Sequence, residues 1–468
     1  MVSLIPYDVA IGQISIAIRR QMAGFGAAKR EVSGRRFCIG EDFGMKRMTI
    51  IVLQVAVSLA AWAQPPADKG LIPERILLTW TGDPARTQTV TWRTDTLTTG
   101  GAQIALALPS PDLAKQSKLV LAVTTSTETT AGITVAYHTA PFTGLEPATK
   151  YAYRVGNGDV WSEWNHFTTA NDTPSPFSFI YVGDAQNDVK SLWSRVIREA
   201  FRRAPDVRFT LHAGDLINNA NTDWQWGEWF EAAGWINRMI PCIAIPGNHE
   251  YFKPDRNTSI TLSHLWTPQF EYPRNGVPGL EDTTYYLDYQ GVRIVCLNSN
   301  EKWEQQAPWL EDTLSKNPHK WTILTFHHPV YSAAILRDNP KVRETWLPII
   351  DKYKVDLVLQ GHDHTYGRSK ALTSGTVVGE GDSGTVYVVS ISGPKMYDST
   401  TASKHLMERI AEYTQFYQIV SINGDVLKYE ALTPAGELYD QFELHKLATG
   451  GSQLINRIPS LAERRRKR

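Results

Sequence analysis

Residues 177–184 read Phe-Ser-Phe-Ile-Tyr-Val-Gly-Asp, an apolar run that ends in a glycine and a carboxylate. Four later apolar runs end in a comparable way, and their endings are Gly214-Asp215, Gly247-Asn248-His249-Glu250, His327-His328-Pro329 and Gly361-His362-Asp363-His364. Short apolar runs bounded by turn residues are typical of buried strands. Because ligands of open α/β sheets gather beyond the carboxyl ends of the strands, we expect these five endings to meet at one place.

The side chains at these endings have the chemistry of metal ligands. Mixed imidazole and carboxylate groups suit zinc, iron or manganese, whereas an all-oxygen set would suit calcium or magnesium. Six strong ligands exceed what one four-coordinate zinc needs, so they suit a pair of metal ions that share a bridging carboxylate. The glycines before four of the endings are expected to let the backbone turn tightly. The candidate ligands are Asp184, Asp215, Asn248, His327, His362 and His364.

Helical periods between the apolar runs indicate an α/β domain over residues 175–446. The spacing of apolar residues predicts a helix over residues 188–203, with Asp188 as its N-cap, and further helices at about 222–239 and 303–314. Residues 447–468, which end in Arg464-Arg465-Arg466-Lys467-Arg468, are predicted to form a basic, solvated tail.

The segment before this domain, residues 68–170, is strand-like throughout. Residues 76–80 and 89–92 are rich in β-branched and aromatic side chains, and Tyr151, Tyr153 and Val155 alternate with smaller or polar residues. The pattern Leu-x-Pro-x-Thr-x-Tyr at residues 145–151 resembles the tyrosine corner of fibronectin type III domains. Residues 171–176 are a predicted linker.

The N-terminal region has the pattern of a secretory leader. Residues 49–63 are apolar, Lys46-Arg47 precede them, and Ala61-Trp62-Ala63 provides a cleavage site, so residues 45–63 are predicted to be a signal peptide. Residues 1–44 would then be an upstream extension, with translation starting at Met45 or Met48. The alternative is an N-terminal membrane anchor. With cleavage we expect no membrane span, and an exported protein that is periplasmic or extracellular.

Composition excludes several other classes of protein. With 42% hydrophobic residues the chain can form cores, so wholesale disorder is excluded. The 48 basic and 48 acidic residues cancel, and cleavage after Ala63 leaves 40 basic and 44 acidic residues, a net charge of −4. Nothing in this balance indicates nucleic-acid binding. Of three cysteines, Cys242 and Cys296 are expected to be buried free thiols, the alternative being a disulfide between them.

The ordered set of endings resembles the calcineurin-type metallophosphoesterases. Together with the strand-rich segment before it, the set resembles the purple acid phosphatases in particular. This resemblance implies an N-terminal all-β fibronectin III-like sandwich, followed by an α/β domain built as an α/β/β/α sandwich of two mixed sheets.

The resemblance also implies a role for each residue. Asp184 and His364 would bind the first metal ion, Asn248, His327 and His362 the second, and Asp215 would bridge both. His249 would contact the phosphate and protonate the leaving group. His328 would face the substrate or, alternatively, serve in packing.

Two positions depart from the purple acid phosphatase pattern. Asn218 stands where those enzymes have an iron-binding tyrosine, and Gln186 stands where they have glycine and the broader superfamily has a ligand histidine. We therefore expect two divalent ions, zinc, manganese or iron, with ferric iron as the less supported alternative. Gln186 or Asn218 would offer an amide oxygen to the first ion, or water would fill the gap.

The resulting functional hypothesis is an exported, acid phosphatase-like enzyme that hydrolyses small-molecule phosphate monoesters by attack of a metal-activated hydroxide. One alternative is a phosphodiesterase or nucleotide hydrolase using the same site. An alternative of another class is a non-catalytic binding protein with a vestigial metal site. Arg337 either contacts a second anionic group or lies exposed on the surface, and the sequence favours exposure. The sequence does not indicate the oligomeric state.

Overall fold

The computed structural model describes residues 69–255 and 258–466. The predicted extension, residues 1–44, and the predicted signal peptide, residues 45–63, lie outside these residues. Within the described part, no helix combines the length and the apolar character that crossing a membrane requires.

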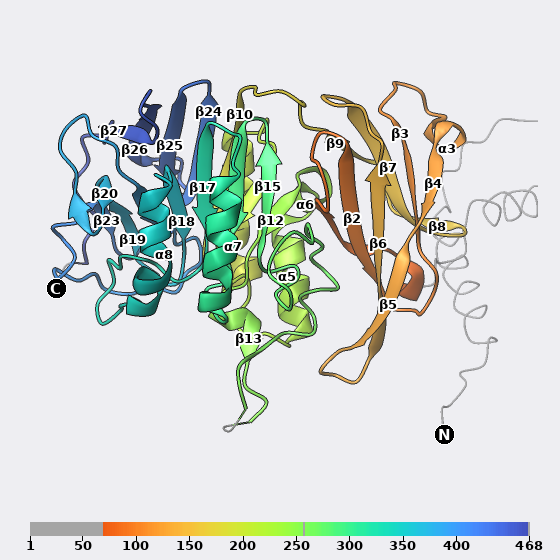
Figure 1. Ribbon diagram of the computed structural model, residues 1–468. Helices are drawn as coiled ribbons and strands as arrows, with labels where there is room; N and C mark the ends of the chain where they lie inside the picture. Colours follow the sequence, from red (N-terminus) through yellow and green to blue (C-terminus); the bar gives the residue numbers. More distant parts are fainter. Residues whose placement is uncertain (1–68, 256–257, 467–468) are drawn as a thin grey trace, which may run out of the picture. The chain divides into compact units, whose positions relative to one another are not determined.

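The first domain is a sandwich of two antiparallel sheets, as the sequence predicted (Figure 1). One sheet has the order β1 (Glu74–Thr79), β2 (Thr87–Thr94), β6 (Thr134–Thr143) and β5 (Val123–Glu128). The other has the order β4 (Lys118–Leu121), β3 (Gly101–Leu106), β7 (Lys150–Asn157) and β8 (Val160–Trp161), with β9 (Asn165–Thr168) also paired to β7. Short helical segments lie at η1 (Lys69–Leu71) and α3 (Leu113–Gln116). The hydroxyl of Tyr151 accepts a hydrogen bond from the backbone N–H of Glu146 at 2.9 Å, which is the contact expected of a tyrosine corner.

The second domain contains two seven-stranded mixed sheets. Sheet I has the order β12 (Cys242–Ala244), β11 (Thr210–His212), β10 (Phe177–Val182), β24 (Tyr417–Asn423), β25 (Val426–Leu432), β26 (Leu438–Lys446) and β27 (Ser452–Asn456). Strands β10, β11 and β12 are parallel, and the remaining pairings are antiparallel. Residues 452–456, which the sequence analysis assigned to a tail, thus form the edge strand of sheet I. Their apolar character is confined to Leu454 and Ile455, because an edge strand covers little of the core.

Sheet II has the order β15 (Tyr285–Tyr289), β16 (Val292–Cys296), β17 (Trp321–Thr325), β18 (Leu357–Gln360), β22 (Val386–Val389), β19 (Tyr366–Ser369) and β23 (Met407–Ala411). Strands β16, β17, β18 and β22 are parallel. Two small hairpins lie outside the main sheets, and they are formed by β13 (Tyr251–Phe252) with β14 (Thr261–Leu262) and by β20 (Leu372–Thr373) with β21 (Thr376–Val377).

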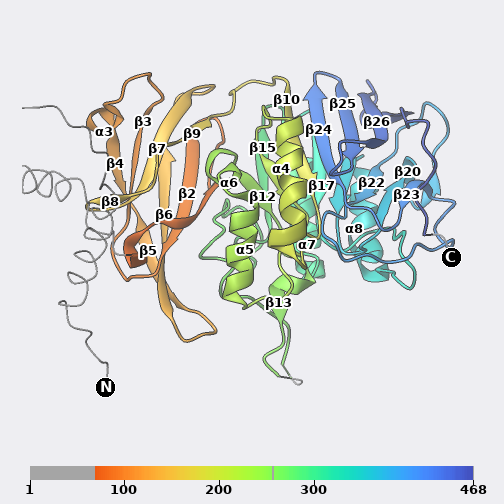
Figure 2. The same ribbon diagram turned by 180° about the vertical axis from the view of Figure 1, so that it is seen from behind.

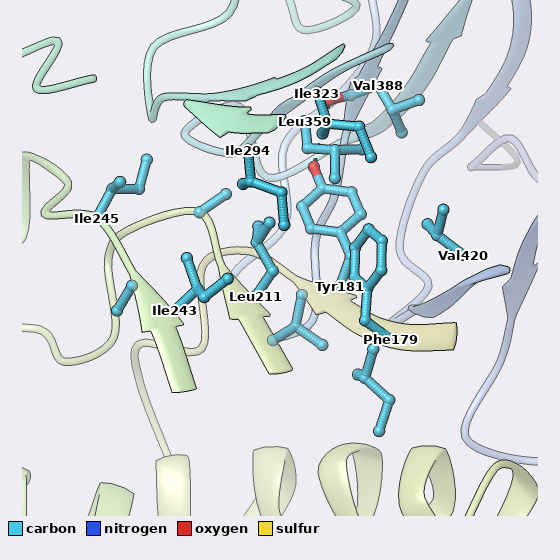
Figure 3. Packing of buried hydrophobic residues seen from close by; sticks show 14 of the residues in the cluster. Phe179, Tyr181, Leu211, Ile243, Ile245, Ile294, Ile323, Leu359, Val388 and Val420 are labelled. Carbon is cyan, nitrogen blue, oxygen red and sulfur yellow. Dashed lines mark hydrogen bonds between the residues drawn. The ribbon is translucent and has the colours of Figure 1, made fainter. Parts of the chain in front are cut away.

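The two sheets face each other across one apolar core (Figure 3). Side chains of sheet I such as Phe179 and Leu211 meet Ile294 and Leu359 of sheet II. The buried hydroxyl of Tyr181 in β10 accepts a hydrogen bond from the backbone N–H of Gln360 in β18 at 2.8 Å. This contact joins the sheets immediately before the endings at Asp184 and His362, so it fixes their relative position.

Helices cover the outer faces of the sheets (Figures 1 and 2). These helices are α4 (Ser194–Arg203), α5 (Asp223–Ala233), α7 (Trp303–Ser315) and α8 (Pro340–Lys352), whereas the short α6 (Ile236–Met239) packs against β1 and β9 of the sandwich. The predicted helix at 188–203 begins with a π-helical turn, η2 (Val189–Trp193), and Asp188 makes no capping hydrogen bond through its side chain. The predicted helix at 222–239 divides at Gly234, whose φ of +61° ends α5.

Candidate metal centre

The parallel strands bring the five endings together. Asp184 and Asp215 follow β10 and β11 at the carboxyl ends of these parallel strands of sheet I. Asn248 begins the short 3₁₀ turn η3 (Asn248–Glu250), which follows β12. His327 and His362 follow the parallel strands β17 and β18 of sheet II. The structure therefore places all six candidate ligands on loops at one end of the two sheets.

One group of ligand atoms surrounds Nε2 of His327. This nitrogen lies 3.2 Å from Oδ2 of Asp215, 3.2 Å from Nδ1 of His362 and 3.3 Å from Oδ1 of Asn248. Ligand atoms in a tetrahedron around zinc are separated by about 3.3–3.4 Å, given zinc–nitrogen bonds of about 2.0–2.1 Å. The Nδ1–H of His327 donates to the carbonyl of Ala213 at 2.8 Å, which orients the ring and leaves Nε2 for a metal ion.

A second group consists of Asp184, Asp215 and His364, whose ligand atoms all lie within 4.8 Å of one another. Nε2 of His364 is 3.7 Å from Oδ1 of Asp184. Nδ1–H of His364 donates to the carbonyl of Lys395 at 3.0 Å, so Nε2 again faces the other ligands. Asp215 belongs to both groups. A pair of metal ions with one bridging carboxylate fits this donor set.

Gln186 lies inside the second group, while Asn218 contacts the site through its backbone. The buried amide nitrogen of Gln186 is 3.0 Å from Oδ2 of Asp215 and 2.9 Å from Nε2 of His364. Its buried Oε1 has no hydrogen-bond partner among the described residues. Turning this amide over would direct Oε1 at the same two ligands, so the chemistry of the side chain fits a metal ion. The carbonyl of Asn218 accepts a hydrogen bond from His249 at 2.6 Å.

Charge in this buried site calls for a cation. Burial raises the pKa of Asp184 well above its usual value. Burial acts on Asp215 in the same direction, but the charges of His327 and His249 outweigh it and hold the pKa of Asp215 below its usual range. Burial lowers and Asp215 raises the pKa of His327, which lies at about 9 as a result. Two adjacent buried carboxylates need compensating positive charge, which divalent metal ions would supply.

The backbone at the site is strained at the ligands themselves. Asp184, Asp215, His362 and His364 have φ values of +52°, +54°, +78° and +49°. A left-handed conformation costs a non-glycine residue about 1–3 kcal/mol and marks a functional position.

Gly214 has a φ of +86°, as the expected tight turn requires, whereas Gly247 and Gly361 serve a different purpose. A Cβ atom on Gly247 would lie 2.2 Å from Oδ1 of Asp215, and one on Gly361 would lie 2.3 Å from Oδ2 of Asp184. Gly247 and Gly361 do not have positive φ. Their role is therefore to let the backbone approach the carboxylates closely, rather than to make the turn.

Glu250 is an organising residue that the sequence analysis did not single out. Its buried carboxylate accepts backbone hydrogen bonds from Asp215 at 2.9 Å, Leu216 at 2.8 Å and Gly247 at 2.7 Å. It thereby holds the loop after β11 against the loop after β12. In the sequence, only the position of Glu250 three residues after Gly247 pointed to this role. A carboxylate at that position is equally typical of a metal ligand.

The two candidate catalytic histidines have different environments. The half-buried His249 donates from Nδ1 to Asn218, and its backbone N–H donates to Oδ1 of Asp215 at 2.9 Å. His328 packs its ring against His362, with 4.3 Å between ring centroids, and its Nδ1 lies 2.9 Å from Oγ of Ser299. Burial lowers the pKa of His328 to about 3. These contacts favour the packing role of His328 over the substrate-facing one.

Arg337 lies beside the candidate metal ligands, in contrast to the surface exposure that the sequence favoured. Its side chain is half-buried, and Nη1 is 2.7 Å from Nε2 of His362. The backbone of the neighbouring Ile335 donates to the carbonyl of Asp398 at 2.9 Å, so the loop after β17 is joined to the loop after β22.

Comparisons with known proteins agree with this architecture. A family model described as calcineurin-like phosphoesterase matches residues 177–366, and one described as purple acid phosphatase, N-terminal domain, matches residues 73–169. The chain thus contains a calcineurin-like phosphoesterase domain and resembles the purple acid phosphatases. Its Gln186 and Asn218 remain the departures from the purple acid phosphatase pattern noted above.

Curated relatives of this purple acid phosphatase-like chain are distant. It is 26% identical over 254 residues to a purple acid phosphatase of Glycine max, covering 51% of this chain and 53% of that protein. It is 26% identical over 248 residues to the Fe(3+)-Zn(2+) purple acid phosphatase 12 of Arabidopsis thaliana, covering 49% and 51%. An uncharacterised protein of Mycobacterium tuberculosis is 26% identical over 322 residues, covering 60% and 59%. The chain thus spans between about half and three-fifths of these relatives.

Solved structures share the fold. The purple acid phosphatase PPD1 of yellow lupin superposes with a TM-score of 0.70 at 18% identity, covering 81% of this chain and 75% of that one. The structure of PhoD superposes with a TM-score of 0.60 at 11% identity, covering 86% and 95%. Both likenesses extend over the sandwich as well as the α/β domain of the purple acid phosphatase-like chain.

Proposed function

We propose that this protein hydrolyses small-molecule phosphate monoesters at a dinuclear metal centre. The observation that carries the proposal is the membership of Asp215 in both groups of ligand atoms. Asp184 and His364 would hold one ion, Asn248, His327 and His362 the other, and Asp215 both. Bound divalent ions would neutralise phosphate charge and lower the pKa of a coordinated water, so that a nucleophile is available near neutral pH.

His249 would act on the leaving group. Its Nδ1–H is engaged by the carbonyl of Asn218, so Nε2 is the ring nitrogen left to exchange a proton. When protonated, Nε2–H would donate to the phosphate and pass its proton to the departing oxygen. The hydrogen bond from its backbone to Asp215 ties His249 to the bridging ligand, which supports this placement.

We propose two divalent ions, zinc, manganese or iron, and no ferric–tyrosinate unit. Asn218 supplies no phenolate at the tyrosine position, and the amide of Gln186 lies within 3.0 Å of two proposed ligands of the first ion, Asp215 and His364. The purified protein should therefore be colourless with each metal. A purple absorption band in the iron-loaded protein would contradict this assignment.

The decisive experiment uses the chain from Gln64 onward, loaded separately with zinc, manganese and iron. We expect metal-dependent hydrolysis of nitrophenyl phosphate that Asn248→Ala abolishes. The matched control is Asn219→Ala, an exposed neighbouring asparagine, which should retain activity. Equal activity in Asn248→Ala and the parent would overturn the proposal.

The same assay separates the alternatives. Turnover of bis-nitrophenyl phosphate without turnover of the monoester would indicate a phosphodiesterase. If a folded, metal-loaded protein hydrolyses neither the monoester nor the diester, a binding protein with a vestigial metal site would be indicated.

We further propose export to the periplasm or the extracellular space, on the signal-peptide pattern of residues 45–63. N-terminal sequencing of the protein made from its own gene should begin at Gln64. A mature chain that retains residues before Met45 would contradict both the leader and the start-site hypothesis.

A further inference from the structure

Arg337 determines the tautomer of His362 in the structure. A guanidinium group has only donors, so at 2.7 Å from Nη1 of Arg337 the Nε2 of His362 must be the acceptor. A neutral imidazole that accepts at Nε2 carries its proton on Nδ1.

Nδ1 of His362 is also the atom that faces the other metal ligands, since it lies 3.2 Å from Nε2 of His327. Coordination at Nδ1 requires a lone pair there, and the ring proton must then move to Nε2. A protonated Nε2 cannot accept a hydrogen bond from Arg337. The contact between Arg337 and His362 and a metal ion on His362 therefore exclude each other.

A guanidinium released from His362 would remain beside the metal ions. Its Cζ lies 5.1 Å from the centroid of the Tyr397 ring, and that ring packs 4.8 Å from His364. Lys395 places a second cation 5.7 Å from the same ring. In the described part of the chain, neither Arg337 nor Lys395 forms an ion pair with a carboxylate. Two cations thus flank the centre on the side of Tyr397, and the charge of Arg337 also acts on the buried carboxylate of Asp363.

We propose that Arg337 is a specificity-determining residue, which leaves His362 when metal binds and then holds a second anionic group of the substrate. This inference rests on the proposed phosphatase function and names its substrate class: phosphate esters that also bear a second phosphate or a carboxylate. The planar fork of a guanidinium pairs with either group through two parallel hydrogen bonds. Lys395 adds charge to the same subsite.

The first test is metal titration by calorimetry, which needs no turnover. Arg337→Met keeps an unbranched stem over Tyr397 and removes the donor that competes with metal at His362. We expect metal to bind about two- to tenfold more tightly to this variant, the equivalent of one hydrogen bond. Arg202→Met, which removes an exposed arginine of α4, is the matched control and should bind metal like the parent. Unchanged or weaker metal binding in Arg337→Met would overturn the proposed competition between Arg337 and the metal ion at His362.

The second test compares kcat/KM within two pairs of substrates. Fructose 1,6-bisphosphate and fructose 6-phosphate differ by a phosphate, and 3-phosphoglycerate and glycerol 3-phosphate differ by a carboxylate. We expect the parent to favour the member with the extra anion, and Arg337→Met to lose roughly tenfold to a hundredfold of that preference. Arg337→Lys should retain part of it. Loss in one pair only would identify which anion is the natural one.

The outcomes separate the two proposals. If the parent hydrolyses fructose 6-phosphate or glycerol 3-phosphate, but its preference for the substrate with the extra anion is the same in Arg337→Met, the proposed subsite is wrong and the phosphatase function stands. If the parent hydrolyses none of the four substrates with any metal, the phosphatase function fails and the substrate class fails with it. The calorimetric result then still decides whether Arg337 competes with metal at His362.

Discussion

Single residues at the centre combine strained backbone with buried charge. Asp184 and Asp215 are both fully buried and have positive φ, yet only Asp215 belongs to both groups of ligand atoms. Two carboxylates that look alike in the sequence, each after Gly at the end of an apolar run, therefore have different consequences when replaced.

We predict different losses of metal from the two carboxylate variants. Asp215→Ala should lose both ions, because it removes a ligand of each, whereas Asp184→Ala should retain about one ion per chain. Metal content after dialysis, measured by plasma emission, distinguishes them. Retention of two ions by Asp215→Ala would rule out the bridging role.

His249 should affect the reaction and leave the metal content unchanged. Loss of a positioned general acid lowers rates by about 10²–10⁴-fold, and we expect His249→Ala to lower kcat in that range. Metal content should equal that of the parent, because in the described part of the chain the one hydrogen bond from His249 to a candidate ligand comes from its backbone. Full activity in His249→Ala would show that another group protonates the leaving oxygen.

His138 in the sandwich should make stability depend on pH. Burial lowers its pKa to about 4, and its two ring nitrogens lie 2.9 Å from Oγ1 of Thr94 and of Thr124. Between the folded pKa and the usual value of about 6.5, the unfolded chain binds a proton that the folded chain does not. The stabilising contribution of neutral His138 to the folded state is therefore complete above pH 6.5, and it is lost as the pH falls towards 4.

The expected loss from His138 at pH 5 is about 2 kcal/mol, from roughly 1.4 kcal/mol per pH unit. Urea unfolding at pH 7.5 and pH 5 should show this loss in the parent and not in His138→Gln. His405→Gln, which changes an exposed histidine, is the control and should behave like the parent. An identical pH dependence in His138→Gln would mean that His138 titrates normally in the fold.

At the scale of elements, the C-terminal segment after β27 supports the loop that orients His364. Glu412, just after β23, accepts hydrogen bonds from the backbone of Arg466 at 2.7 Å and of Ser399 at 2.9 Å. Ser399 belongs to the same loop as Lys395, whose carbonyl holds the ring of His364. The segment that the sequence suggested to be a solvated tail is thus attached to the site.

Removal of residues 457–468 should weaken metal binding at His364. We expect about two- to tenfold lower affinity for the first ion and little change for the ion at His327. The reason is that the hydrogen bonds made by the C-terminal segment support the loop beside His364. Calorimetric titration measures both. Glu412→Ala in the full chain should reproduce the effect, and equal weakening at both ions would point to general loosening instead.

The elements show why the sequence predicted some parts of the fold and missed others. The strands before Asp184 and His362 were predictable, because strands buried on both faces are continuous apolar runs. Strand β27 was not, because an edge strand needs few apolar residues. The ligand set follows from residue type and strand order. The contact of Arg337 with His362 was beyond prediction, since it depends on how two loops pair through Ile335 and Asp398.

At the scale of the whole molecule, an ion cluster joins the sandwich to the α/β domain. Asp223 in α5 accepts hydrogen bonds from Arg75 in β1 and from Arg93 in β2, both at 2.8 Å. The two arginine side chains are 7% and 9% exposed. Loss of the shared carboxylate would leave the nearly buried Arg75 with Glu74, at 3.8 Å, as its one carboxylate partner among the described residues, whereas Arg93 would keep Glu74 and Asp95.

Asp223→Ala should lower the free energy of unfolding by on the order of 2–4 kcal/mol. Asp172→Ala, which breaks an exposed pair with Arg86, is the matched control and should cost less than about 1 kcal/mol. Urea unfolding followed by tryptophan fluorescence measures both. Similar small losses in the two variants would show that the cluster contributes little to joining the domains.

The two buried cysteines allow local unfolding of each sheet to be measured by the rate of thiol labelling. Cys242 lies in β12 of sheet I and Cys296 in β16 of sheet II, neither is in a disulfide, and burial raises the pKa of the Cys242 thiol to about 12. They are the only cysteines from Gln64 onward. A thiol reagent can reach each one only when its own sheet separates. Labelling rates in single-cysteine variants would therefore give the order in which the two sheets come apart.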